Sequence, residues 1–513
     1  MKFIFQVFLA CLLPFIAMTQ QMDTTIINQI KAEALGNSQL PQLAQYLTDV
    51  CGPRLTNSPG YRNAVNWTVK TFQGWGIKAA PEAWGEYGKG WSNEVATLSI
   101  EKPYHETLVA YAMPYSGSTK NLVNTGVIVI DNLDSATIDK AGESLKGKIV
   151  IVKSRTTQLP ASLNADAYRY SDSDLVKMRD QDVIPPQMVT VMKARLKGQY
   201  ETKLYLEKKG AVALVSGRGR DGTVFVSAYL GYAKQFGPTL PELVIPAEQS
   251  LKLQRLAGTA GLLSLSINVQ SKFYTDDLTG YNVIAEIPGT DPKLKNEVVM
   301  IGAHLDSWTT ATGATDNAAG CVVMMETLRI IQKLGLKPKR TIRVALWGGE
   351  EQVILGSVGY VKKHFADPAD MKLKAEHKSI SAYYNLDNGT GKIRGIYLQG
   401  NEGAGKLFSE WFQPFADLGA RTVTTKYSGG SDQEAFEGVG IPAFPFIQDP
   451  LDYDTRTHHS NIDVYERLSI EDLKQCAAIV ASFAYLTAMQ TEMIPRKPLP
   501  VAGSFPLSNG LVP

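Results

Sequence analysis

Histidine and carboxylate side chains recur directly after apolar segments in the second half of this 513-residue chain. In chain order they are His304, Asp306, Asp316, Glu350, Glu351, Asp387, His458 and His459. Imidazole and carboxylate ligands together favour zinc, although cobalt and manganese bind to similar sets. Two histidines and three carboxylates suffice for two divalent metals if one carboxylate bridges them. The sequence therefore predicts a metal centre assembled from separate loops.

The same residues provide for catalysis as well as for metal binding. A catalytic metal must keep one position for water, and two neighbouring metals can share that water as hydroxide. Such a hydroxide needs a base that takes its proton and later returns it. Glu350 and Glu351 are adjacent, so one of them can bind metal while the other acts as the base.

The segments that precede these residues indicate how they are positioned. Buried strands are expected at 298–303, 341–347, 381–386 and 443–447, and helices at 318–336, 403–418 and 470–489. This alternation predicts an α/β fold with a mixed, largely parallel central sheet flanked by helices. Sites in such sheets lie in the loops beyond the carboxyl ends of the strands. The candidate ligands follow the expected strands in that way.

The first half of the chain has a different texture. Residues 24–76 look helical, with breaks at 52–53 and 57–60, whereas 106–270 contains short β-rich runs separated by loops. We therefore expect a mainly β domain that is inserted into the catalytic domain. The expected units are 21–105 and 271–495 for the catalytic domain, 106–270 for the insertion, and 496–513 for a C-terminal tail.

The N-terminus has the layout of a secretory signal peptide. Lys2 precedes an apolar run from 3 to 18, and polar residues follow from Thr19. The run is short for a membrane anchor, which needs about 20 residues, and Cys11 is poorly placed for lipid attachment. We expect cleavage near residue 20, export to the periplasm or the medium, and no stable membrane span in the mature protein.

Charge and cysteine content exclude other classes. The formal net charge is +2 and no long Lys/Arg run occurs, which argues against nucleic acid as a partner. Cys51, Cys321 and Cys476 remain after the signal segment, without a CxxC pair. Neither a disulfide framework nor cysteine ligation of a metal is expected.

Five short motifs carry a family resemblance. They are His304-Leu305-Asp306-Ser307, Gly313-Ala314-Thr315-Asp316-Asn317, Trp347-Gly348-Gly349-Glu350-Glu351, Asn385-Leu386-Asp387 and His459-Ser460-Asn461-Ile462-Asp463. In this order they resemble the co-catalytic zinc exopeptidases, a family with bacterial aminopeptidases, glutamate carboxypeptidase and carboxypeptidase Q. Trp308, residues 338–341 and the double histidine at 458–459 are most similar to the carboxypeptidase Q branch. Each motif alone has an ordinary explanation, such as a helix cap at Asp316.

The resemblance implies a role for each residue. The implied ligands of one zinc ion are His304, Asp316 and Asp387, and those of the other are Asp316, Glu351 and His459. Glu350 would be the general base for a metal-bridging hydroxide that attacks the peptide carbonyl. Asp306 resembles the family carboxylate that orients the His304 imidazole. A cis peptide bond is expected between Asp316 and Asn317.

One loop departs from the family pattern. Many relatives carry Ser-Asp-His where this chain has Ser431-Asp432-Gln433, so substrate contacts from this loop are in doubt. Asp432 is the candidate partner for a substrate ammonium group, with a water-facing loop carboxylate as the alternative. His458 is a second candidate for substrate binding. The 106–270 insertion resembles a protease-associated domain.

The resemblance implies hydrolysis of dipeptides or short peptides by two zinc ions per chain. It leaves open whether the action is that of a carboxypeptidase Q-like dipeptidase or of an aminopeptidase, and a homodimer is compatible with it. A non-catalytic receptor on the same fold is the alternative, because fold does not determine function. Glutaminyl cyclisation by a one-zinc relative is disfavoured, since the ligands for a second metal are all present.

Overall fold

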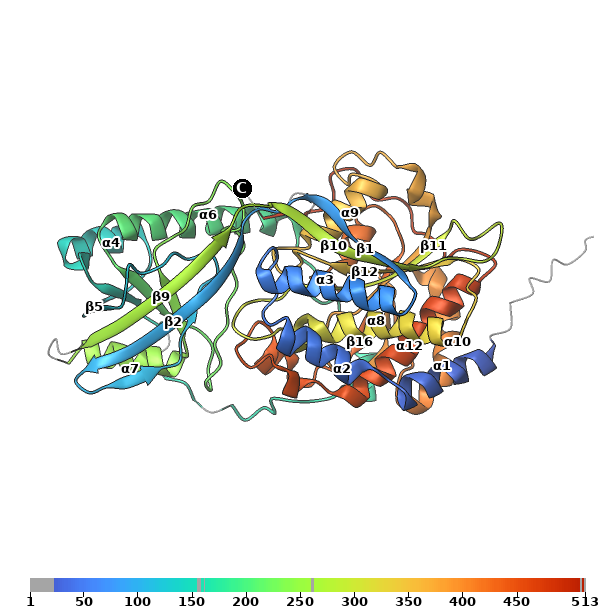
Figure 1. The fold of residues 1–513 in the computed structure, drawn as a ribbon, viewed down its shortest axis with the longest axis horizontal. Helices are drawn as coiled ribbons and strands as arrows, with labels where there is room; N and C mark the ends of the chain where they lie inside the picture. Colours follow the sequence, from blue (N-terminus) through green and yellow to red (C-terminus); the bar gives the residue numbers. More distant parts are fainter. Residues whose placement is uncertain (1–22, 155–157, 161, 260–262, 508–509, 512–513) are drawn as a thin grey trace, which may run out of the picture.

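The computed structural model describes residues 23–513 apart from 155–157, 161, 260–262, 508–509 and 512–513. The expected signal peptide, residues 1–20, lies outside the described residues. Two eight-stranded sheets organise the chain, one in each half of an elongated molecule (Figure 1). We call them the catalytic sheet and the second sheet.

The catalytic sheet is mixed, with a parallel centre. Its strands are, in spatial order, β1 (Lys78–Glu86), β10 (Thr279–Ile287), β12 (Thr341–Trp347), β11 (Val298–His304), β13 (Ile380–Asn385), β16 (Ala443–Gln448), β14 (Ile393–Tyr397) and β15 (Thr422–Thr424). Strands β12, β11, β13 and β16 pair in parallel. All seven residues of β11 are buried, as is typical of parallel strands covered on both faces. The predicted α/β fold is thus confirmed.

Helices cover both faces of the catalytic sheet. They are α1 (Thr24–Gly36), α2 (Leu40–Gln45), α3 (Pro59–Gly74), α8 (Ala319–Lys333), α9 (Leu355–His364), α10 (Gly405–Phe412), α11 (Gln433–Glu437) and α12 (Ile470–Met489). The helix expected over 470–489 is confirmed. The helix expected over 403–418 is shorter, because Pro414 follows the end of α10 and the chain continues as a 3₁₀ turn.

The second sheet draws on a longer stretch of chain than expected. Its strands are β3 (Glu106–Leu108), β2 (Gly90–Lys102), β9 (Ser264–Tyr274), β5 (Val123–Ile130), β6 (Ile149–Val152), β7 (Ala213–Gly217), β8 (Glu242–Ile245) and β4 (Tyr111–Ala112). Helices α4 (Ser135–Ala141), α5 (Asp172–Val176), α6 (Pro186–Lys208) and α7 (Ala247–Ala257) lie in the same stretch. Because β2 pairs with β9 over most of its length, we place the start of the proposed inserted unit at Gly90 instead of 106.

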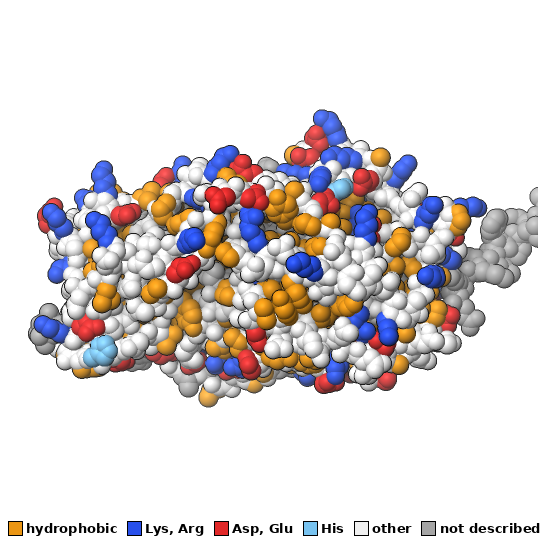
Figure 2. Space-filling model, in the orientation of Figure 1, with side chains coloured by type: hydrophobic (Ala, Val, Ile, Leu, Met, Phe, Trp, Pro, Cys, Tyr) orange, Lys and Arg blue, Asp and Glu red, His pale blue; other side chains and the backbone are white. Residues whose placement is uncertain are grey.

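The surface is mixed in charge, and the described part of the chain contains no helix long and apolar enough to cross a bilayer. Figure 2 shows acidic and basic side chains interspersed over one face. The three cysteines Cys51, Cys321 and Cys476 are buried and free.

A buried ion network fixes the helix that follows the candidate metal ligands. On α8, the Arg329 guanidinium lies 2.7 Å from Glu326 and 2.7 Å from Glu33 of α1. Removing the cation would leave two buried carboxylates uncompensated, which typically costs about 3–5 kcal/mol. We expect Arg329→Met to lower the free energy of unfolding by about that much, as measured by chemical denaturation. The exposed Lys234–Glu86 pair is the control: Lys234→Met should cost at most ~1 kcal/mol. Equal losses would contradict this account.

Candidate metal centre

The parallel strands deliver the predicted ligands to one edge of the catalytic sheet. His304 is the last residue of β11, Glu351 follows the end of β12, and Asp387 follows the end of β13. Asp316 lies in the loop just before α8, where the peptide bond to Asn317 is cis, as the resemblance implies. The candidate ligands are separated by up to 155 positions in the sequence. They meet because neighbouring parallel strands end at the same edge of the sheet.

Asp316 is at the centre of the cluster. Its Oδ1 atom lies 3.1 Å from Nε2 of His304, which in turn lies 3.1 Å from Oδ1 of Asp387. Its Oδ2 atom lies 3.3 Å from Nε2 of His459, which lies 3.1 Å from Oε2 of Glu351. The two oxygens of one carboxylate thus face two separate sets of ligands.

The contacts of His304 indicate that a cation is needed between its ring and the carboxylates of Asp316 and Asp387. Its Nδ1 lies 3.1 Å from the backbone carbonyl oxygen of Asp306, an acceptor to which Nδ1 must donate. In the neutral imidazole, Nε2 then carries a lone pair, yet it faces the carboxylates of Asp316 and Asp387. A cation between the three groups would satisfy all of them.

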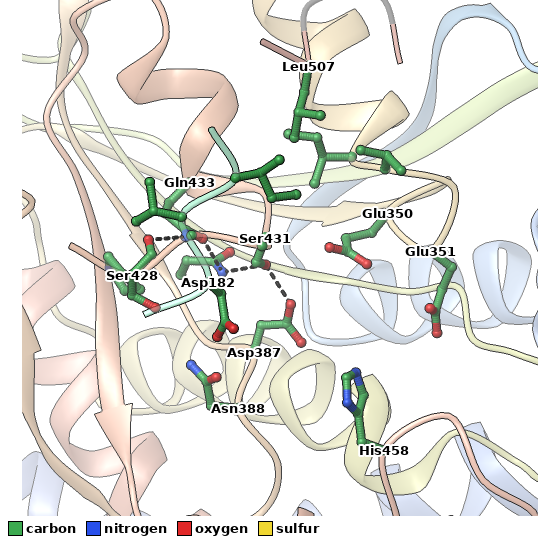
Figure 3. Close-up of a pocket in the computed structure, with 18 of the residues that line it drawn as sticks. Asp182, Glu350, Glu351, Asp387, Asn388, Ser428, Ser431, Gln433, His458 and Leu507 are labelled. Carbon is green, nitrogen blue, oxygen red and sulfur yellow. Dashed lines mark hydrogen bonds between the residues drawn. The ribbon is translucent and has the colours of Figure 1, made fainter. Parts of the chain in front are cut away.

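The two adjacent glutamates differ in position. The side chain of Glu351 is 2% exposed and turns toward His459, whereas Glu350 lies 4.0 Å from His304 and is 11% exposed. Figure 3 shows the Glu350 carboxylate pointing into the cavity beside the cluster. Burial raises the pKa of Glu351 to about 8, and burial also raises the pKa of Glu350 well above its ordinary value. The two side chains thus have different neighbours: Glu351 faces His459, and Glu350 faces the cavity.

Asp306 contacts more of the site than the sequence indicated. Its Oδ1 lies 3.6 Å from Nδ1 of His304, so the nearer contact with that ring is made by the Asp306 backbone. The carboxylate accepts hydrogen bonds from the backbone N–H groups of Glu350 and Glu351, at 3.2 and 3.3 Å, and from the Thr56 hydroxyl at 2.9 Å. Asp306 thus positions the turn that carries both glutamates.

Two residues positioning the site were missed at the sequence level. Asp463 accepts hydrogen bonds from the backbone N–H groups of Thr315 and Asp316, at 2.6 and 3.1 Å. The motif that starts at His459 includes Asp463, so the signal was present. Arg54 is completely buried, and its guanidinium donates to the carbonyl oxygens of Leu305 and Gly313.

His458 lies next to the cluster without completing it. Its Nε2 atom is 3.8 Å from Oδ2 of Asp316, its side chain is 43% exposed, and its ring stacks on Tyr453 with centroids 4.8 Å apart. His458, His459 and Asp316 are close enough to hold an ion together. However, Nε2 of His459 lies 3.1 Å from Glu351, which is shorter than its 3.3 Å distance to Asp316. His458 lines the cavity.

The expectation for Asp432 was wrong. The residue is completely buried, burial raises the pKa of its carboxyl to about 8, and it is not among the residues that line the cavity. A substrate ammonium group in the cavity therefore has no access to it, and the water-facing alternative also fails. The neighbouring Ser431 is the member of this loop that contacts a candidate ligand, because its hydroxyl donates to Oδ2 of Asp387.

A cavity of about 680 Å³ opens beside the cluster (Figure 3). Its polar side is formed by ligands, by Glu350 and by the glycine-rich loop 428–431. Its apolar side is formed by Ile184, Met188, Met192, Val353, Ile354 and Leu507, among others. Met188 and Met192 belong to α6, so the proposed inserted unit contributes a wall of this cavity.

Comparison with known proteins gives a consistent result. Residues 282–484 match the model of "Peptidase family M28". Carboxypeptidase Q of Bos taurus is 24% identical over 475 residues, covering 92% of this chain and 90% of the relative. A peptidase M28 precursor from Shewanella amazonensis is 25% identical, with a TM-score of 0.66 and coverage of 93% and 98%. The zinc aminopeptidase BSAP from Bacillus subtilis shares the fold, with 18% identity, a TM-score of 0.55 and coverage of 88% and 95%.

The matched segment contains His304, Asp316, Glu351, Asp387 and His459, and the match to solved structures extends over both sheets. Residues 282–484 thus match peptidase family M28, and over most of its length the chain is similar to metallopeptidases.

Proposed function

We propose that the chain is an exported zinc-dependent exopeptidase that hydrolyses dipeptides or short peptides and holds two zinc ions. The observation that carries this proposal is the position of Asp316, whose two carboxylate oxygens face His304 and Asp387 on one side and His459 and Glu351 on the other. Carboxypeptidase Q and the zinc aminopeptidases among the similar proteins support both the metal and the reaction class.

The residues fit a pair of zinc ions. Two ligand atoms that are each ~2.1 Å from one tetrahedral zinc ion lie roughly 3.4 Å apart, and the four N–O distances in the cluster are 3.1–3.3 Å. Oδ2 of Asp316 and Oε1 of Glu351 are buried without a hydrogen-bond partner. Metal ligation would satisfy both atoms.

The chemistry then divides among the residues. Zinc bound at these ligands would polarise the scissile carbonyl and lower the pKa of the attacking water. The Glu350 carboxylate, which faces the cavity, accepts the proton of that water and delivers it to the leaving amine. Ser431 and Asp306 hold Asp387 and the glutamate turn in place.

The proposal is tested with a panel of free dipeptides, N-blocked dipeptides and aminoacyl anilides. The zinc-loaded protein should cleave at least one class, lose activity with a chelator, and regain it with zinc. Preference for dipeptides would indicate carboxypeptidase Q-like action, and cleavage of anilides would indicate aminopeptidase action. If the zinc-loaded protein cleaves none of them, the non-catalytic alternative gains support.

Export and assembly are separate parts of the proposal. The apolar run at 3–18 supports a signal peptide, and N-terminal sequencing of the exported protein should show a start near residue 20. A homodimer can be checked by light scattering after size exclusion.

Asp306 offers a prediction about positioning. In Asp306→Asn, an NH₂ group would replace one acceptor that faces the backbone N–H donors of Glu350 and Glu351. Loss of such supporting contacts typically costs 10- to 100-fold in metal affinity or activity, and we expect a loss of about that size in zinc titration against a competing chelator or in kcat/KM. Asp291→Asn is the matched control, because Asp291 also accepts two backbone N–H bonds but in a distant turn. Comparable losses in both variants would contradict a local role.

A further inference from the structure

The segment expected as a C-terminal tail reaches the catalytic cavity. Leu507 lines that cavity together with Val353 and Ile354, which follow the turn that carries the two glutamates. Figure 3 shows Leu507 on the side of the cavity that lies opposite to His458 and Asn388. Residues far beyond the last candidate ligand in the sequence therefore contribute a wall to the site.

The tail is attached firmly to the catalytic domain. The Arg496 guanidinium donates to two backbone carbonyl oxygens at the start of β13, at 2.9 and 2.7 Å, and Lys497 forms an ion pair with Glu437. Leu507 itself is only 2% exposed. It belongs to a cluster of buried side chains that includes Ile354, Val358, Phe505 and Leu511. Leu507 is thus fixed by the core on one side and faces the cavity on the other.

The turn between Glu351 and α9 is strained. Val353 and Ile354 have φ angles of 76° and 51°, in the left-handed region that β-branched residues rarely adopt. Strained backbone of this kind is concentrated at functional sites, where the surrounding structure maintains it. The backbone N–H groups of both residues donate to the Glu350 carbonyl oxygen, at 2.7 and 2.9 Å. One turn therefore places the candidate base and two apolar side chains next to each other at the cavity.

The surface formed by Leu507, Val353 and Ile354 is apolar, and Met188 and Met192 of α6 extend it. We call these five residues the apolar wall. A polar group pressed against them would lose water without gaining a hydrogen bond, whereas an apolar group would remove further apolar surface from water. A scissile carbonyl at the metal ligands lies beside Glu350, so the side chain of an adjacent substrate residue meets this wall.

We propose that Leu507 is a specificity-determining residue and that the apolar wall binds an aliphatic or aromatic side chain next to the scissile bond. This inference rests on the proposed peptidase function. Leu507 sets the depth of the subsite because the core fixes its side chain, whereas the flexible methionines of α6 adapt to the bound group. The side chain has two sources, namely the residue before the scissile bond and the residue after it.

The experiment uses the zinc-loaded full chain and two series of dipeptides, X-alanine and alanine-X, in which X is alanine, leucine or phenylalanine. The values of kcat/KM are measured for wild type, Leu507→Ala and Leu507→Phe. Leu507→Ala deepens the subsite, and we expect the ratio of kcat/KM for phenylalanine to that for leucine to rise about tenfold. Leu507→Phe fills the subsite and should lower the same ratio about tenfold. The alanine peptide, which does not reach the wall, should be affected least.

The two series distinguish the sources of the side chain. If the residue before the scissile bond occupies the subsite, the ratio changes in the X-alanine series alone. If the residue after the bond occupies it, the ratio changes in the alanine-X series alone. Dissociation constants of leucine amide and phenylalanine amide, measured by titration calorimetry, provide the same ratio without turnover.

Leu511→Ala is the matched control for Leu507→Ala. Leu511 lies in the same tail, is 1% exposed and belongs to the same cluster, but it is not among the residues that line the cavity. Loss of folded protein would lower kcat/KM for all substrates by one factor, so it leaves the ratio unchanged. A change in the ratio therefore reports on the subsite, and Leu511→Ala should show none.

The inference is overturned if both Leu507 variants leave the ratio unchanged in both series and with the amides. It is also overturned if Leu511→Ala shifts the ratio as much as Leu507→Ala does. Either result would leave the proposed peptidase function intact, since hydrolysis by the wild type and its loss with a chelator test that function separately.

Discussion

Replacing Glu350 with glutamine is expected to lower kcat by about 100- to 10,000-fold while the protein stays folded and keeps its metals. Glutamine has nearly the same shape but cannot accept the proton of the attacking water. Because the Glu350 carboxylate faces the cavity whereas Glu351 turns toward His459, the loss should appear in turnover and not in metal content. Steady-state kinetics and metal analysis of the same preparation measure both.

Glu351→Gln is the matched comparison for that variant. The substitution again replaces a carboxylate with an amide, but at the neighbouring residue. It therefore removes the charge of a candidate ligand that lies 3.1 Å from His459. We expect it to reduce metal content as well as activity. If Glu350→Gln remains active while Glu351→Gln retains all of its metal, the two roles are reversed.

The second large effect is expected for Asp316→Asn. An amide offers one neutral oxygen in place of two anionic ones, so it cannot serve both sets of ligands at once. Metal content should fall from two ions per chain to at most one, and kcat/KM should fall by at least as much as in Glu350→Gln. Isothermal titration of metal-free protein with zinc, followed by assay, measures this.

Asp463→Asn serves as the control for Asp316→Asn. Asp463 is also buried and contacts the same loop. Its carboxylate accepts hydrogen bonds from backbone N–H groups of that loop, and it lies outside the candidate ligand set. It should retain two metals with an affinity loss of about 10- to 100-fold. An Asp316→Asn protein that still binds two zinc ions would show that Asp316 does not bridge them.

The candidate ligands lie together in the structure, as the sequence predicted, because strand ends and motifs coincide. His304, Glu351 and Asp387 each follow an apolar run, and parallel strands bring such positions to one edge. Asp306 was recognised for a similar reason, but its contacts with the Glu350–Glu351 turn depend on how β11 and β12 lie side by side. That arrangement belongs to the sheet and not to either segment alone.

The failure at Asp432 has a local cause. Ser431 and Gln433 line the cavity, whereas the residue between them points into the core. The sequence shows that this loop is near the site but not which of its side chains face the cavity. Glycine-rich loops lack the regular alternation that would settle the question.

The central claim is that two metals share the Asp316 carboxylate, and anomalous diffraction at the zinc edge from crystals of zinc-loaded protein tests it most directly. We predict two anomalous peaks, one beside His304 and Asp387 and one beside Glu351 and His459, with Asp316 in contact with both. A single peak in fully active protein, with His459 and Glu351 bonded directly to each other, would contradict the two-metal account.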